Sequence, residues 1–131
     1  MIETNTQHLK GGDRFGDRLD YAVIYSLVNL NNGKRYIGRT HNPKQRIRNH
    51  LISLRGHYHK NKLMNADSNC PFGYEVLEEN IAVIDETEKE RYWILHFKTN
   101  DSRYGYNTED PMFRYHNIMV QKGEKYERNR V

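Results

Sequence analysis

The stretch AVIYSLVNLNNGKRYIGRTHNP, residues 22–43, decides the fold because two apolar runs flank an Asn-Gly pair. Both runs are rich in β-branched and aromatic residues, which favour strands. Asn-Gly tolerates the positive φ angles of a type I′ turn, a common connection in hairpins. Residues 21–38 are therefore predicted to form a β-hairpin that turns at Asn32 and Gly33.

A helix is predicted directly after the hairpin, over residues 43–55. Asn42 can cap its first turn, and Pro43 suits the first helical position because its missing N–H has no partner there. Gly56 is expected to end the helix. Three residues at helical spacing form its apolar face: Ile47, Leu51 and Leu54.

The following segments indicate two more helices and a third strand. Residues 59–67 are predicted to form a short helix, and residues 72–80, FGYEVLEEN, a strand. Asp85, with Glu88 three positions later, has the pattern of a capping box. It would open a helix that ends near Asn100.

The order of these elements predicts the α+β class, with a small antiparallel or mixed three-stranded sheet flanked by helices. Residues 104–107, YGYN, are expected to form a turn or short strand at the end of this unit. Residues 1–20, which include a Gly-rich stretch of alternating charge, are predicted to be a loose arm that becomes ordered on the domain or on a ligand. Residues 108–131 form a C-terminal extension of mixed charge, so residues 21–107 are the expected domain.

Composition limits the class of protein. The 131-residue length favours one domain. No apolar run approaches the ~18 residues that a membrane span needs, and the N-terminus lacks the apolar segment of a secretory signal. Cys70 is the only cysteine, which excludes an intrachain disulfide and a cysteine-based metal site. We expect an intracellular, cytoplasmic protein without membrane contact.

Positive charge is concentrated in residues 31–62, which contain nine Lys or Arg and no Asp or Glu. The chain is +4 overall and this window is +9, so the remainder is −5. Such a window favours a polyanion partner, because each cation placed on a phosphate releases a counterion. A solvated basic helix face is the plainer alternative. The candidate nucleic-acid contacts are Lys34, Arg39, Lys44, Arg48, Arg55 and His59.

Two candidate catalytic residues, Arg46 and His50, lie one turn apart on the predicted helix 43–55. They border its apolar face, so they are expected where the helix meets the sheet. For an arginine in that position, an ion pair with a nearby acid is the structural alternative.

Glu90 precedes Trp93, Ile94 and Phe97 by three, four and seven residues, which places it on the inward face of its helix. An inward carboxylate is costly unless a cation or hydrogen bonds meet it. The candidates are a metal ion and an inward arginine such as Arg46. A hard divalent cation would suit it, because Mg²⁺ takes oxygen ligands and water.

Together these groups fit phosphodiester cleavage. The hairpin supplies two phenols, Tyr25 and Tyr36, beside the inward arginine, histidine and glutamate. Such a reaction needs a base to activate water, a cation to stabilise charge on the phosphate and a metal to polarise it.

The arrangement resembles the GIY-YIG nuclease superfamily over about residues 21–107. Five short motifs occur in the family's order. They are VIY at 23–25, with Val23 where glycine is usual, YIG at 36–38, RIRNH with Arg46 and His50, ERYW with Glu90, and GYN ending in Asn107.

The resemblance implies a role for each matched residue. Tyr36, Tyr25 or His50 would activate or orient the attacking water, and Arg46 would hold the scissile phosphate. Glu90 would bind one divalent ion per site, Mg²⁺ or Mn²⁺. Asn107 would support the site. His59, or His57 in the same GHYHKN segment, would occupy the place of an additional active-site histidine found in some homing members.

The implied activity is a metal-dependent endonuclease acting on double-stranded or branched DNA, without a small-molecule cofactor. A compact nuclease of mobile-element or phage type, in a bacterial or phage-infected cell, is the preferred expectation. Repair, junction-cutting and restriction roles remain open at this stage. The alternative function is a non-catalytic nucleic-acid-binding module that uses residues 31–62.

Overall fold

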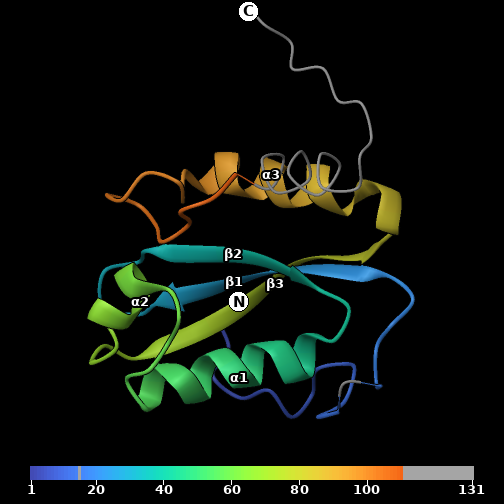
Figure 1. Cartoon of the computed structure of the whole chain (residues 1–131), viewed down its shortest axis with the longest axis horizontal. Helices are drawn as coiled ribbons and strands as arrows, with labels where there is room; N and C mark the ends of the chain where they lie inside the picture. Colours follow the sequence, from blue (N-terminus) through green and yellow to red (C-terminus); the bar gives the residue numbers. More distant parts are fainter. Residues whose placement is uncertain (15, 111–131) are drawn as a thin grey trace, which may run out of the picture.

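A computed structural model describes residues 1–14 and 16–110, which form three layers (Figure 1). The middle layer is a three-stranded antiparallel sheet, which agrees with the predicted α+β class. Its strands are β1 (Ala22–Asn29), β2 (Arg35–Thr40) and β3 (Phe72–Ile81), in the order β2-β1-β3.

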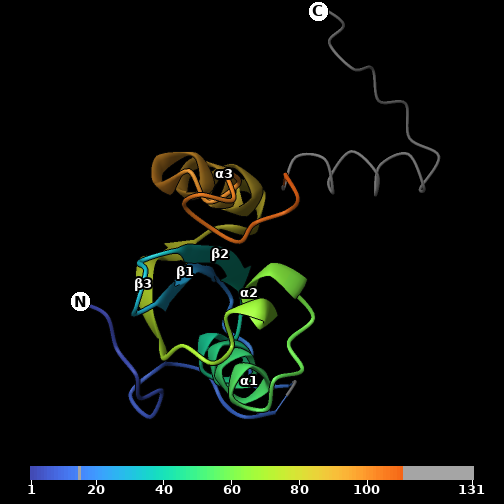
Figure 2. The same cartoon turned by 90° about the vertical axis from the view of Figure 1, so that its left-hand side faces the viewer.

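Helices cover both faces of the sheet. Helix α1 (Pro43–Arg55) lies on one face and α3 (Glu86–Phe97) lies on the other, as the turned view in Figure 2 also shows. The short helix α2 (Lys62–Ala66) is five residues long, so the predicted helix over residues 59–67 was too long. A 3₁₀ turn, η1 (Val83–Asp85), precedes α3.

The hairpin of β1 and β2 has the predicted strands but a different turn. Gly33 has a φ of +76°, whereas Asn32 is not among the described residues with positive φ, so the type I′ prediction was wrong. The Asn29 side-chain oxygen accepts hydrogen bonds from the N–H groups of Asn31 (2.9 Å) and Asn32 (3.4 Å). This buried asparagine therefore organises a longer loop in place of the two-residue turn.

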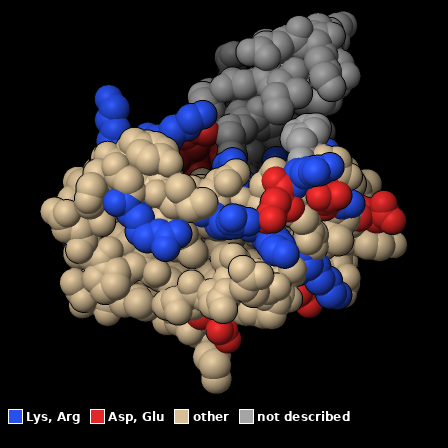
Figure 3. All heavy atoms as spheres, turned by 90° about the horizontal axis from the view of Figure 1, so that it is seen from below, with Lys and Arg blue, Asp and Glu red and all other residues tan. Residues whose placement is uncertain are grey.

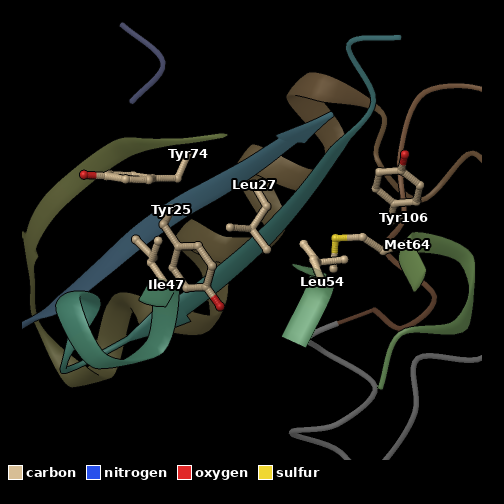
Figure 4. Close-up of a cluster of buried hydrophobic side chains, with 7 residues drawn as sticks. All are labelled: Tyr25, Leu27, Ile47, Leu54, Met64, Tyr74 and Tyr106. Atoms are coloured by element: carbon tan, nitrogen blue, oxygen red, sulfur yellow. The ribbon is translucent and has the colours of Figure 1, made fainter. Parts of the chain in front are cut away.

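Apolar side chains form one core on each side of the sheet. On the α1 side, Tyr25, Leu27, Ile47 and Leu54 pack with Met64, Tyr74 and Tyr106 (Figure 4). On the α3 side, the core residues are Ala22, Ile24, Ile37, Ile81 and Ile94. The two cores fix both helices against the sheet, and the predicted apolar face of α1 is the face that is buried.

One of the two predicted helix caps forms in the structure. The Asn42 side chain caps α1 by accepting from Gln45 N–H, and Pro43 is in its first turn. Asp85 precedes α3 but makes no side-chain capping hydrogen bond, so the predicted capping box does not form. Helix α3 ends at Phe97, where Lys98 adopts a left-handed conformation with a φ of +56°, and not near Asn100.

The N-terminal arm packs on the domain. Glu3 and Tyr74 exchange backbone hydrogen bonds of 2.7 Å each, which adds a bridge beside β3. The Lys10 carbonyl accepts from Lys44 N–H at 3.2 Å. Of the two ways in which the arm was expected to become ordered, on the domain or on a ligand, these contacts show the first. Of the predicted extension 108–131, residues 111–131 lie outside the described part of the chain.

Residues 104–107 lie along the free edge of β2, as the prediction of a short strand allowed. Arg35 and Gly105 form a parallel bridge there. Asn107 continues the pairing with its side chain, because its Oδ1 accepts from Ile37 N–H at 2.8 Å and its Nδ2 donates to the Ile37 carbonyl at 2.9 Å. An edge strand otherwise exposes such groups, so these bonds hold β2 in place.

Charge is mixed on the α1 side of the molecule. Figure 3 shows Lys and Arg side chains spread across this face with Asp and Glu among them toward one side. Among the described residues, no helix has the length and apolar composition to cross a membrane.

The first testable prediction concerns Tyr106, whose buried hydroxyl accepts from Asn29 Nδ2 at 3.0 Å and donates to Asp67 at 2.6 Å. Tyr106→Phe leaves both partners without this hydroxyl, so the unfolding free energy is expected to fall by about 1–3 kcal/mol. Tyr104→Phe, at a residue that is 47% exposed, is the matched control and is expected to cost less. Urea denaturation of both variants measures the difference, and equal effects would contradict it.

Candidate functional site

The strand register places the two hairpin phenols on the same face of the sheet. Tyr25 lies opposite Gly38 and Tyr36 lies opposite Leu27 in the β1–β2 pairing. Side chains at alternate strand positions share a face, so both tyrosines point toward α1, which also packs Ile47 against Tyr25.

An open pocket of about 470 Å³ lies between this face, α1 and the segment that follows it. Arg46 and His50 line it one helical turn apart, as predicted, and Tyr36 lines it from β2. Its remaining lining residues are Asn49, Ile52, Ser53, Tyr58, His59, Lys60 and Asn61.

A chain of polar contacts leads from the pocket into the core. The Tyr25 hydroxyl lies 2.7 Å from His50 Nε2, and His50 Nδ1 lies 2.7 Å from His59 Nε2. Tyr25 is 1% exposed and His50 is 7% exposed. His59, predicted as a nucleic-acid contact, is thus half-buried and stacked on the His50 ring.

Burial and the neighbouring guanidinium set the protonation of this chain. Burial, followed by the positive charges of Arg46 and His59, lowers the pKa of His50 to about 3. Burial and Arg46 also lower the pKa of His59. Both rings are therefore neutral at physiological pH.

The Arg46 guanidinium lies beside both phenols. It is a hydrogen-bonding neighbour of Tyr25, and the Tyr25 hydroxyl is the main cause of the raised pKa of Arg46. Burial, followed by the charge of Tyr36, raises the pKa of Tyr25 despite this cation. Tyr25 is thus a neutral phenol in this structure, and Arg46 keeps its charge at the pocket wall.

Gly38 provides the space that the Tyr25 hydroxyl occupies. A Cβ atom at position 38 would lie 2.4 Å from that oxygen. The tyrosine therefore lies directly over the backbone of β2, and a side chain at Gly38 would displace it.

Glu90 is inward-facing and 2% exposed, as predicted. An inward arginine pairs with it, as one of the two candidates from the sequence required, but this arginine is Arg39, whose Nε lies 3.4 Å from Glu90 Oε1. Arg39 also donates to the Thr87 hydroxyl at 2.6 Å and lies 3.8 Å from Glu86. The Glu90 charge still acts on Arg46, although Glu90 does not line the pocket.

Glu90 is the candidate metal ligand. Its surroundings suit an ion that is held by only one protein carboxylate. The described residues contain no group of three or more His, Cys, Asp or Glu side chains that could hold a metal ion. Mg²⁺ commonly keeps several waters and binds through one or two carboxylates plus substrate phosphates. A single buried carboxylate therefore fits an ion completed by water and phosphate oxygens.

The basic residues 31–62 are partly neutralised in the folded chain. Lys44 is half-buried, Arg55 is exposed on α1, and Lys34 is half-buried near the hairpin loop. Three other cations of this window pair with acids from outside it: Arg35 with Glu75 at 2.9 Å, Arg48 with Asp13 at 2.8 Å, and Arg39 with Glu86 and Glu90.

The sequence analysis placed Arg39 among the candidate nucleic-acid contacts and did not identify its pairing with Glu90, and it did not name Asn61. The strand alternation carried a signal for Arg39, because it pairs with Ile24 and so shares the α3 face with Ile37. Nothing in the local pattern pointed to Asn61, whose place depends on the conformation of the segment after α1.

Comparison with known proteins agrees with this geometry. The sequence profile of the GIY-YIG catalytic domain matches residues 21–107. The catalytic domain of the intron endonuclease I-TevI, as a variant, is similar with a TM-score of 0.60 and 26% identity, covering 69% of this chain and 95% of that one. The catalytic domain of the homing endonuclease I-TevI gives 0.59 and 26%, covering 68% and 99%. No curated protein matches the chain.

The fold and the site thus define an enzyme of the endonuclease class. The chain belongs to the GIY-YIG catalytic domain family, as the resemblance of its motifs had indicated.

The second prediction tests the close approach at Gly38. Gly38→Ala is expected to push the Tyr25 hydroxyl away from His50 and to lower the rate of DNA cleavage by about ten-fold or more. Gly16→Ala is the matched control, since a Cβ there meets nothing within 4 Å. Cleavage rates and melting temperatures of both variants are compared. A Gly38→Ala enzyme with full activity would remove this contact from the site.

The third prediction concerns pH. His50 has a folded-state pKa of about 3 and an unfolded value near 6.5. Between these values the unfolded chain binds the proton that the folded chain does not, so His50 makes the unfolding free energy fall as pH drops from about 6.5 toward 3. NMR titration of the His50 ring is expected to show no protonation above pH 4. A titration midpoint of the His50 ring near pH 6.5 would contradict the prediction.

Proposed function

We propose that this chain hydrolyses DNA phosphodiester bonds as a divalent-metal-dependent endonuclease. The observation that carries the proposal is the convergence of Arg46, Tyr36 and His50 on one pocket. Tyr25 is bonded to His50 behind the pocket wall, and the Glu90 carboxylate acts on Arg46 from the opposite face of the sheet. Residues 21–107 would form the catalytic unit, and the N-terminal arm would support it.

Arg46 would bind the scissile phosphate. Its guanidinium interacts with both phenols, and the neighbouring hydroxyl of Tyr25 is the main cause of its raised pKa at the pocket wall. A cation fixed in this way is positioned before the reaction for the negative charge that grows on the phosphoryl oxygens. Lys60, at the same pocket, would contribute to binding the DNA backbone.

Tyr36 would contact the attacking water. It lines the pocket, whereas Tyr25 is buried beneath Gly38 and bonded to His50. A pocket-facing phenol beside Arg46 can accept a hydrogen bond from the attacking water, and as it takes the proton of that water it passes its own hydroxyl proton to a phosphoryl oxygen. His50 is neutral, but both of its ring nitrogens are already engaged, so we assign it an orienting role.

Glu90 would hold one divalent ion, Mg²⁺ or Mn²⁺, which when bound supplies Lewis-acid polarisation of a phosphoryl oxygen. Arg39 would orient the carboxylate through its contact with Oε1. Asn107 would act through β2. Its side chain is hydrogen-bonded to the backbone of Ile37, which is the residue between Tyr36 and Gly38 in the strand.

The direct test uses the full chain with supercoiled plasmid, branched DNA and RNA, each with Mg²⁺, with Mn²⁺ or with EDTA. We expect nicking or linearisation of DNA that requires the metal. Cleavage in EDTA would contradict the metal requirement, and the absence of cleavage on every DNA substrate would contradict the proposal. The branched arm separates a junction-cutting role from a homing or restriction role.

The fourth prediction separates cleavage from binding. Glu90→Gln is expected to lower cleavage by at least about 100-fold while DNA affinity persists, because Glu90 would serve the metal and not the phosphates. Glu86→Gln is the matched control, since Glu86 also approaches Arg39, at 3.8 Å, one turn earlier on α3. Gel-shift and cleavage assays report the two properties. Equal losses in both variants would mean that Arg39 pairing, not metal binding, explains the effect.

A further inference from the structure

The segment that joins α1 to α2 is held by two asparagines. His59 N–H donates to Asn65 Oδ1 at 2.9 Å, and Asn65 Nδ2 donates to the His57 carbonyl at 3.3 Å. Asn61 Nδ2 donates to the Tyr106 carbonyl at 2.8 Å, and its Oδ1 accepts from Met64 N–H at 2.9 Å. The backbone around the His59 ring is therefore fixed on both sides.

One contact in this segment determines where the His59 ring carries its proton. The backbone N–H of Asn61 points at His59 Nδ1, with 3.0 Å between the two nitrogens. A backbone N–H can only donate, so Nδ1 must be the unprotonated nitrogen. The proton of the neutral His59 ring is then on Nε2.

The direction passes on to His50 and Tyr25. His59 Nε2–H faces His50 Nδ1 at 2.7 Å, so that nitrogen must accept and the His50 proton is on Nε2. His50 Nε2–H in turn donates to the Tyr25 oxygen at 2.7 Å. If His50 carried its proton on Nδ1, that proton and the His59 Nε2 proton would both lie between the two rings. A charged His50 would have the same conflict, because both of its ring nitrogens carry protons.

We propose that Asn61 is a positioning residue whose backbone N–H sets a one-way hydrogen-bond chain, from His59 to His50 to Tyr25. The Tyr25 oxygen then accepts from His50 and has Arg46 as a second donor. Its own proton is left to donate to a third group. For the catalytic consequence, which rests on the proposed function, Tyr25 acts from behind the pocket wall through Arg46 and Tyr36, because it is 1% exposed and does not line the pocket.

This direction gives the two phenols different roles. Tyr25 has its proton turned away from His50, while Tyr36 lines the pocket. A Tyr25 that donated to His50 would instead turn only lone pairs toward Arg46 and would have no proton for a third group. The Asn61 contact therefore decides the polarity of the buried end of the site.

The first experiment is a long-range ¹H–¹⁵N NMR spectrum of the full chain without DNA or metal. We expect both His50 and His59 to show an unprotonated Nδ1 and a protonated Nε2. A protonated Nδ1 on either ring would overturn the proposal. The spectrum does not depend on cleavage, so this result and the failure of the nuclease proposal are distinguishable.

The second experiment removes the N–H itself. Asn61 has a φ of −74°, which is within the range of proline, so Asn61→Pro deletes the donor and the side chain together. Asn61→Ala deletes the side chain alone and is the matched control. The fifth prediction is that His59 keeps its tautomer in Asn61→Ala and populates the Nδ1-protonated form in Asn61→Pro.

The cleavage assay provides the catalytic readout. Asn61→Pro is expected to have a turnover about five-fold below that of Asn61→Ala, the effect of one hydrogen bond, with a smaller change in KM. Identical tautomers and identical turnover in the two variants would overturn the proposal. If Asn61→Pro does not fold, the wild-type spectrum alone decides it.

Discussion

The register of β1 against β2 is the constraint on which the rest of the site depends. Tyr25 opposite Gly38 and Tyr36 opposite Leu27 place both phenols on the α1 face. A slip of one residue would turn Tyr36 toward α3, because side chains alternate across a strand. The register also places Gly38 under the Tyr25 hydroxyl, where a Cβ atom would lie within 2.4 Å. The backbone pairing therefore determines which face of the sheet the two phenols occupy, and it also provides the space for the Tyr25 hydroxyl.

That register makes a buried hydroxyl unavoidable, and the neighbouring polar groups follow from it. An unpaired hydroxyl in a core costs about 1–3 kcal/mol. His50 meets Tyr25 from the buried side of α1, and His59 meets His50 from the next segment. Burial keeps both rings neutral, so Arg46 is the charge in contact with the phenols. The site thus combines the Arg46 cation with neutral hydrogen-bonding groups.

Local periodicity was enough to predict the strands, the buried face of α1 and the inward position of Glu90, since each depends on residues a few positions apart. It failed where a distant or neighbouring side chain competes. The turn at Asn32 follows from hydrogen bonds to Asn29. The partner of Glu90 is Arg39 because the two belong to separate elements on the α3 face. Asn61 acts through a backbone N–H, which no residue pattern can reveal.

The edge strand explains how groups on opposite faces of a sheet can act together. A central strand has a hydrogen-bonded neighbouring strand along each of its edges. Strand β2 has β1 along one edge, and the 104–107 segment follows only part of the other edge. Consecutive residues of β2 then serve both layers: Gly38 supports Tyr25 on the α1 face, and Arg39 contacts Glu90 on the α3 face. Because the layers are linked through adjacent peptide units, any shift of β2 would move the guanidinium of Arg39 and the floor beneath Tyr25 at once. The side chain of Asn107, bonded to both backbone groups of Ile37, opposes that shift.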